Sequence, residues 1–385
     1  MIDTIRLELP QSMYTIIDHT KFTPSTYPMF TCGAWNSGTV TFSKQNPTNI
    51  DKKAGIYKPR LTITRRPLKN LGYQNTLYVE LSLPKLVFGN NFDELSDEDF
   101  NTVLDCLYEV LKTMGVLVYK NQLPQAQVSA IHYGKNIILD DYTTPYTYIK
   151  ELKNIDISKT LDVNQTDYRN GGLSYKLHTN LFEFAFYDKI KELEISKFSE
   201  KRSLEKDNYC QLSLLDYMQE QKQNSSPFEV LRLELRLNNR KKIKQYLKRI
   251  GLQENSTLEY LFDQQIAKKI LLSFYDSITN KGEYSYKTNS LLHTFESLKK
   301  ASPKSRDQQH LELCSALSII NDVGVREFRN LIEDRTWYRI KKQLEMLKKQ
   351  PNNYLIKIQN NLNEFIQAKL VDYPQLMINN DKYET

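Results

Sequence analysis

Residues 181–189 read Leu-Phe-Glu-Phe-Ala-Phe-Tyr-Asp-Lys, an alternation of apolar and mostly polar side chains. Because successive side chains of a strand point to opposite faces of a sheet, Phe182, Phe184 and Phe186 would share one face. The opposite face would carry Glu183, Ala185, Tyr187 and Lys189. The stretch therefore predicts a strand that buries one face against a core and carries candidate catalytic residues on the other face.

Similar alternation occurs elsewhere in the chain. It is clearest in residues 230–237, where leucines alternate with Arg232, Glu234 and Arg236. Weaker versions predict strands in residues 1–9, 57–65, 76–83, 128–133 and 173–178. Segments of this kind are typical of a sheet with one hydrophobic face and one polar face. The Asn170-Gly171-Gly172 sequence is a turn signal that suits a hairpin between two of the strands.

Helix signals separate and follow the predicted strands. Ser96 and Asp99 have the spacing of a capping box, apolar residues follow at helical spacing to Met114, and Gly115 is a natural stop. Shorter helices are expected in residues 146–152, 188–197 and 212–219. After Asn238 the pattern is helical, with segments at 239–250, 256–278, 311–320 and 325–332.

These patterns predict an α+β fold. At 385 residues the chain is too long for one typical core, so two or three domains are expected. We expect a mixed, mainly antiparallel sheet domain in residues 1–245 and an all-helical accessory domain in residues 246–385. The two strand sets could be the halves of a duplicated domain, residues 1–140 and 141–245.

Composition narrows the class of protein. The chain is 40% hydrophobic and 26% charged, as in ordinary globular proteins. Apolar runs are too short for a spanning helix and the first residues do not resemble a signal peptide, so we expect a cytoplasmic protein without a membrane partner. Four cysteines lie singly, at Cys32, Cys106, Cys210 and Cys314, which disfavours a zinc cluster.

Acidic side chains recur on the predicted polar faces of three strands. They are Glu80, Glu183 and Glu234, and His132 could lie near them. If these strands are neighbours, Glu234, Glu80 and His132 could bind Mg²⁺ or Mn²⁺, since both ions accept oxygen ligands and can offset charge on a phosphodiester. Each residue also has an ordinary interpretation, because an outward glutamate beside an arginine is usually a solvated ion pair.

Tyr187 is the candidate nucleophile on the polar face. A phenol with a pKa near 10 is protonated at neutral pH, so attack requires a base or a cation that stabilises the phenolate. Glu183 could be the base, and Lys189 or a metal ion could supply the cation. Arg232 and Arg236 could stabilise the phosphate oxygens and the leaving group. A strand tyrosine taken alone is most often structural.

The excess of positive charge is clustered. Lys and Arg number 53 against 46 Asp and Glu, and six of these cations lie in residues 239–250, which contain no acid. They are Arg240, Lys241, Lys242, Lys244, Lys248 and Arg249. Such a helix could contact several phosphates of DNA.

A second basic segment lies near the C-terminus. Residues 335–342 interleave cations with aromatic residues and follow two short predicted helices, as in a helix-turn-helix. Arg335, Trp337 and Arg339 are its candidate DNA contacts. The alternative is a solvated helix face with Trp337 in a core.

Several motifs in one order resemble the gene II replication initiator family of filamentous phages and its phage and plasmid relatives. The motifs are Met1-Ile2-Asp3, Val79-Glu80-Leu81-Ser82-Leu83-Pro84-Lys85-Leu86-Val87-Phe88-Gly89-Asn90-Asn91, the stretch through Tyr187, Leu231-Arg232-Leu233-Glu234-Leu235-Arg236 and Arg335-Thr336-Trp337-Tyr338-Arg339. Each motif is loose alone, and together they span most of the chain. One departure is Ala130-Ile131-His132, where relatives carry Arg-Ile-Asp; histidine binds Mn²⁺ better than Mg²⁺.

The resemblance implies a rolling-circle initiator with a replication-initiator-like nickase domain. Such a protein nicks one strand of a double-stranded origin, keeps the 5′ phosphate on a tyrosine, leaves a 3′ hydroxyl as primer and later rejoins the displaced strand. The family's nucleophile falls on Tyr187, and its arginine-acid-arginine strand on Arg232, Glu234 and Arg236. A host helicase and polymerase would be partners. The alternatives are a non-catalytic origin-binding protein and a relaxase or recombinase of a mobile element.

Overall fold

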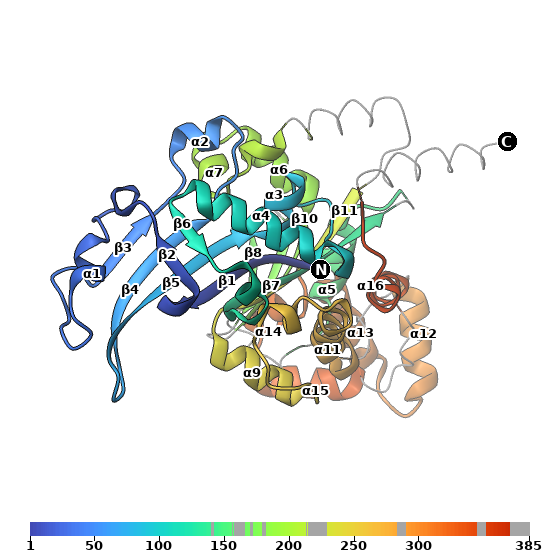
Figure 1. Cartoon of the computed structure of the whole chain (residues 1–385). Helices are drawn as coiled ribbons and strands as arrows, with labels where there is room; N and C mark the ends of the chain where they lie inside the picture. The colour runs from blue at the N-terminus through green and yellow to red at the C-terminus, as the bar shows by residue number, and fades with distance from the viewer. Residues whose placement is uncertain are drawn as a thin grey trace.

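The computed structural model describes residues 1–139, 142–155, 157, 166–169, 172–178, 182–212, 214, 229–282, 290–344 and 352–369. The centre of the described fold is a nine-stranded sheet with the order β3-β4-β5-β1-β7-β11-β10-β9-β8, in which every pair of neighbours is antiparallel (Figure 1). The predicted α+β class and its mainly antiparallel sheet are thereby confirmed.

The strands of the large sheet are β1 (Ile2–Pro10), β3 (Phe42–Gln45), β4 (Arg60–Leu68), β5 (Gly72–Ser82), β7 (Gln127–Leu139), β8 (Thr166–Arg169), β9 (Ser174–His178), β10 (Phe182–Asp188) and β11 (Glu229–Leu237). A small separate ribbon pairs β2 (Tyr14–Ile16) with β6 (Val116–Val118). Strands from residues 2–139 form one side of the large sheet and those from residues 166–237 the other. The two sides meet where β7 pairs with β11.

The two faces of the sheet differ as the alternation predicts. Leu231, Leu233, Leu235 and Leu237 of β11 are buried with Phe184 and Phe186 of β10 in one large hydrophobic cluster. Helices cover this face: the ring of Phe274 in α11 lies 4.8 Å from that of Phe182 and 4.3 Å from that of Tyr246 in α9. The opposite face carries the charged residues of the same strands, which is where the candidate site lies.

The helices are α1 (Tyr27–Thr31), α2 (Asn49–Lys53), α3 (Leu83–Phe88), α4 (Phe100–Thr113), α5 (Pro145–Lys153), α6 (Lys189–Lys197), α7 (Glu200–Glu205), α9 (Arg240–Arg249), α10 (Leu258–Leu261), α11 (Gln264–Gly282), α12 (Leu291–Ala301), α13 (Asp307–Val323), α14 (Val325–Leu331), α15 (Asp334–Leu344) and α16 (Asn353–Glu364). Figure 1 places α9 and α11 below the sheet and α2, α6 and α7 above it.

Local signals explain several helix ends. Ser96 and Asp99 form the predicted capping box before α4, and Gly115 after it has a φ of 81°. The side chain of Asn239 accepts a hydrogen bond from the backbone N–H of Lys241 at the start of α9. The predicted turn at Asn170-Gly171 and most of the helix expected in residues 212–219 lie outside the described residues.

Two hydrophobic clusters bear on the expected domain boundary. Side chains of α9, α10, α11 and α16 belong to the same cluster as the sheet. Helices α12–α15 share a separate cluster built around Leu317, Ile320, Phe328, Trp337 and Ile340. The clusters therefore do not divide at residue 245, and the division into domains stays a prediction. The described helices include none with the length and hydropathy needed to cross a bilayer.

Candidate active site on the polar sheet face

Strand pairing brings the candidate site residues together from both sides of the sheet. His132 of β7 lies opposite Arg236 of β11, and Arg236 lies opposite Glu183 of β10. Tyr187 lies opposite Arg232 in the same way. Glu234 lies between Arg232 and Arg236 on β11, so β11 supplies the centre of the site. Sequence alone could not show this arrangement, because β11 pairs not only with β10, which precedes it in the chain, but also with the distant strand β7.

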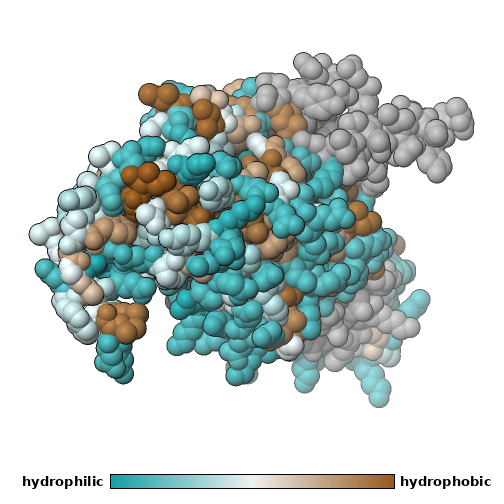
Figure 2. Space-filling view, viewed as in Figure 1, coloured by the Kyte–Doolittle hydropathy of each residue, from teal (hydrophilic) through white to brown (hydrophobic). Residues whose placement is uncertain are grey.

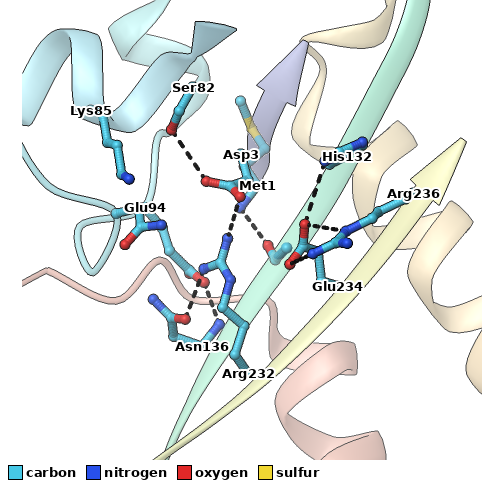
Figure 3. A network of polar contacts seen from close by, with 12 residues as sticks. Met1, Asp3, Ser82, Lys85, Glu94, His132, Asn136, Arg232, Glu234 and Arg236 are labelled. Atoms are coloured by element: carbon cyan, nitrogen blue, oxygen red, sulfur yellow. Dashed lines mark hydrogen bonds and ion pairs between the residues drawn. The ribbon is translucent and has the colours of Figure 1, made fainter. Parts of the chain in front are cut away.

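Glu234 is the most constrained carboxylate of the site. Its Oε2 accepts a hydrogen bond from the Tyr187 hydroxyl at 3.0 Å and one from Arg236 Nη2 at 3.1 Å. Its Oε1 accepts one from Arg236 Nε at 2.9 Å, and His132 Nδ1 lies 3.5 Å away (Figure 3). The Glu234 side chain is only 3% exposed. Each carboxylate oxygen therefore already has two polar neighbours.

The electrostatics of Glu234 and Tyr187 follow from this arrangement. Burial opposes ionisation of Glu234, but the charge of Arg236 and the hydrogen bonds of His132 and Arg236 hold its pKa well below the usual range. Burial and then the negative charge of Glu234 raise the pKa of Tyr187 well above 10. At neutral pH the pair is therefore a carboxylate that accepts a hydrogen bond from a protonated phenol.

Arg232 packs beneath the site and depends on a glycine. Its Nη1 donates to Asn136 Oδ1 at 2.8 Å, and its Nη2 lies 3.4 Å from Asp3 Oδ2 (Figure 3). A Cβ at Gly134 would lie 2.8 Å from Arg232 Cζ, so only glycine lets the guanidinium lie across β7. Among the described residues, the buried Nε of Arg232 has no hydrogen-bond partner.

Glu183 lies on the polar face of β10 as expected, whereas Lys189 does not. Glu183 lies next to the site but is paired, through Oε1, with Arg236 Nη1 at 2.8 Å and Lys176 Nζ at 2.9 Å. The expectation that Lys189 continues the face of the strand is wrong, because β10 ends at Asp188 and Lys189 begins α6. Its ammonium lies 5.4 Å from the centre of the Phe92 ring and it is 2% exposed.

The three expected metal ligands are not gathered. Glu80 of β5 lies opposite Arg6 of β1 and Arg60 of β4, so β1 and β7 separate it from Glu234 on β11. His132 and Glu234 do approach each other, but the Glu234 oxygens are engaged. Within the described part of the chain, no group of three or more His, Cys, Asp or Glu side chains could hold a metal ion. These residues as arranged do not fit a Mg²⁺ or Mn²⁺ site.

The six cations of α9 remain candidates for DNA contacts. Ile243 and Leu247 bury one side of the helix, and Arg240, Lys241, Lys248 and Arg249 are exposed. Lys242 and Lys244 are half-buried. Two of the exposed residues have acidic neighbours, since Arg240 lies 3.4 Å from Glu8 and Lys248 lies 3.2 Å from Glu254.

The C-terminal basic segment corresponds to α15, which follows α13 and α14. Trp337 is not available to DNA: it is 1% exposed and packs edge-on against Phe328, so the alternative of a core tryptophan is the one the structure shows. Arg335 and Arg339 are exposed, and Arg339 pairs with Glu312 of α13. Tyr338, next to Trp337, is the aromatic residue exposed on this helix.

Sequence reasoning missed Asp3, Gly134 and Asn136 as parts of the site. Asn136 is four residues after His132 and therefore on the same face of a strand. The predicted strand ended at Tyr133, whereas β7 continues to Leu139. Lys135 interrupts the apolar alternation, and it is tolerated because its ammonium is buried 2.6 Å from Glu94 Oε2.

Comparison with known proteins adds no relative. No family model, no curated protein and no solved structure matches the chain. The resemblance to the gene II initiators therefore stays a prediction, and the function has to be argued from the site itself.

Proposed function

We propose that this chain nicks and rejoins one strand of DNA through Tyr187, as an initiator of rolling-circle replication. The observation that carries the proposal is the 3.0 Å hydrogen bond from the Tyr187 hydroxyl to Glu234, on a sheet face that also carries Arg232 and Arg236. A phenol beside a fixed carboxylate is arranged to lose its proton as it attacks. The ordered motifs shared with gene II initiators support the same reaction.

The reaction is a transfer of a phosphodiester bond. The Tyr187 oxygen forms a bond to phosphorus while the bond from phosphorus to the 3′ oxygen breaks. The phenol proton moves by way of the Glu234 carboxylate to water, and the leaving 3′ oxygen takes up a proton from water, so that no net proton is gained or lost. The products are a 5′ phosphotyrosine and a free 3′ hydroxyl. Attack of a 3′ hydroxyl on the phosphotyrosine reverses these changes and rejoins a strand without a nucleotide cofactor.

The arginines have separate roles in this proposal. Arg236 holds Glu234 through Nε and Nη2 and Glu183 through Nη1, and its side chain is 31% exposed, so a phosphate that approaches the guanidinium competes with Glu183. Arg232 is buried and places positive charge beneath Tyr187, which favours the phenolate. The expectation of Mg²⁺ or Mn²⁺ stays a prediction, and none of the steps above depends on the metal ion.

The test is capture of the covalent intermediate. The full chain is incubated, with and without Mn²⁺, with a random-sequence pool of single-stranded oligonucleotides containing 3′-bridging phosphorothiolate linkages, which prevent rejoining. Mass spectrometry should find the adduct on Tyr187, and Tyr187→Phe should abolish it. Tyr78→Phe is the matched control, because Tyr78 lies on the same sheet face but on β5, and it should retain the adduct within about twofold.

The same experiment separates the main alternative, a non-catalytic origin-binding protein. That alternative has a structural argument of its own, because the raised pKa of Tyr187 and the engaged oxygens of Glu234 describe a resting phenol. DNA binding without any adduct would favour it. An adduct on another residue, or one that persists in Tyr187→Phe, would refute the assignment of the nucleophile.

A further inference from the structure

The hairpin formed by β4 and β5 extends beyond the rest of the sheet. Its turn lies at Lys69–Leu71, and its end projects at the lower left of Figure 1. Asn70 and Gly72 have φ angles of 64° and 76°, which produce the tight reversal. Three apolar side chains near this end face solvent: Leu68 is 43% exposed, Leu71 66% and Trp35 76%. Figure 2 shows hydrophobic atoms beside the end of the hairpin and hydrophilic atoms at its extremity.

The base of this hairpin is held firmly. The buried guanidinium of Arg65 donates to the carbonyls of Met29 at 3.1 Å, Gly33 at 2.7 Å and Asn36 at 2.9 Å. These bonds fix the loop that carries Trp35. A Cβ at Gly72 would lie 2.5 Å from the carbonyl oxygen of Ala34, so glycine is needed for the loop to lie this close. The exposed apolar residues are thus displayed on a rigid support.

The charge around these residues has one sign. Residues 60–75 contain Arg60, Arg65, Arg66 and Lys69 and no acidic residue. Arg66 and Lys69 are exposed at the end of the hairpin and precede and follow Leu68 in the chain. A narrow ribbon with apolar side chains between cations complements DNA, because the cations contact phosphates while apolar side chains inserted at a base step unstack it.

We propose that the β4–β5 hairpin is a wedge that opens duplex DNA. Leu68 and Leu71, supported by Trp35, enter a base step, and Arg66 and Lys69 contact the flanking phosphates. This inference deepens the proposed function, on which it rests, by naming how a single strand is released for Tyr187. The hairpin is part of the same sheet as Tyr187 of β10, since β5 pairs with β1, β1 with β7, β7 with β11 and β11 with β10.

The test compares opening and binding of DNA. Leu68→Ser/Leu71→Ser in the full chain is mixed with an A·T-rich duplex that contains 2-aminopurine, whose fluorescence rises on unstacking. We expect the fluorescence rise to fall roughly tenfold, while affinity for the same sequence with a preformed bubble stays within about twofold. Ile50→Ser, an exposed apolar residue on α2, is the control and should behave as the parent chain.

Each outcome of this experiment supports or contradicts the role of the hairpin as a wedge. Equal opening by the double variant and the parent, or an equal loss in the Ile50→Ser control, would overturn the wedge. Binding to phosphatidylglycerol vesicles that the double variant loses, with duplex opening unchanged, would assign the hairpin to a membrane surface instead. Because the fluorescence signal requires no nicking, a missing Tyr187 adduct would defeat the proposed reaction without affecting this result.

Discussion

Burial of the Lys189 ammonium makes the stability of the folded protein depend on pH. Burial, and then the neighbouring Arg232, lower the pKa of Lys189 to about 7. The unfolded chain would hold this proton up to a pH near 10.5. Between those values the unfolded state binds more protons than the folded state, so this group makes the protein more stable as the pH rises.

Lys189→Met should remove that dependence. From pH 7 to pH 9 the parent should gain about 2 kcal/mol of unfolding free energy through Lys189, and the variant should lack this gain. At pH 7 the variant should also be the more stable protein, because methionine fills a similar volume without a charge. Urea denaturation of both chains at the two pH values measures the difference. Parallel pH dependences of the two chains would contradict a lowered pKa for Lys189.

At the scale of elements, the alternation of apolar and polar residues predicts those strands that have one apolar and one polar face. β10 and β11 could be predicted from their residues, and so could α4 from its capping box. The full length of β7 could not, because Gly134 and Lys135 are explained only by contacts with Arg232 and Glu94. The gathering of His132, Glu234 and Tyr187, and the separation of Glu80, depend on strand order, which no single strand encodes.

The charge on α9 leads to a prediction about salt. Lys241 and Arg249 are exposed cations on this helix. If both contact phosphates, Lys241→Gln/Arg249→Gln should reduce the slope of log affinity against log salt concentration for duplex DNA by about 1.8. Fluorescence anisotropy across a salt series measures the slope. Lys299→Gln/Lys300→Gln on α12 is the control with the same loss of charge, and an equal change in that control would contradict a specific role for α9.

At the scale of the whole molecule, the sheet and the helices that follow it form one structure. Phe182 and Phe184 of β10 contact Phe274 of α11, and Phe365 after α16 belongs to the same cluster. A fragment of residues 1–245 would expose these side chains, and each buried phenylalanine contributes about 1.5–3 kcal/mol. Helices α12–α15, in contrast, share a cluster of their own.

Two shortened chains would test this description. Residues 1–245 alone should fail to unfold cooperatively, because the apolar face of the sheet is uncovered. A chain in which residues 290–344 are replaced by a flexible glycine-serine linker should keep a cooperative transition. Circular dichroism during thermal unfolding distinguishes the two. A cooperative transition in the shorter fragment would support the boundary at residue 245 that the sequence suggested.

The position of β11 has a consequence for synthesis of the protein. β11 is the last of the sheet strands to leave the ribosome, yet it fills the gap between β7 and β10 and brings Glu234 to Tyr187. A nascent chain that stops before residue 229 holds the tyrosine but lacks its proton acceptor. If the site cuts DNA, a chain that terminates before β11 should therefore be unable to nick it. Only chains in which β11 has joined the sheet would react with DNA.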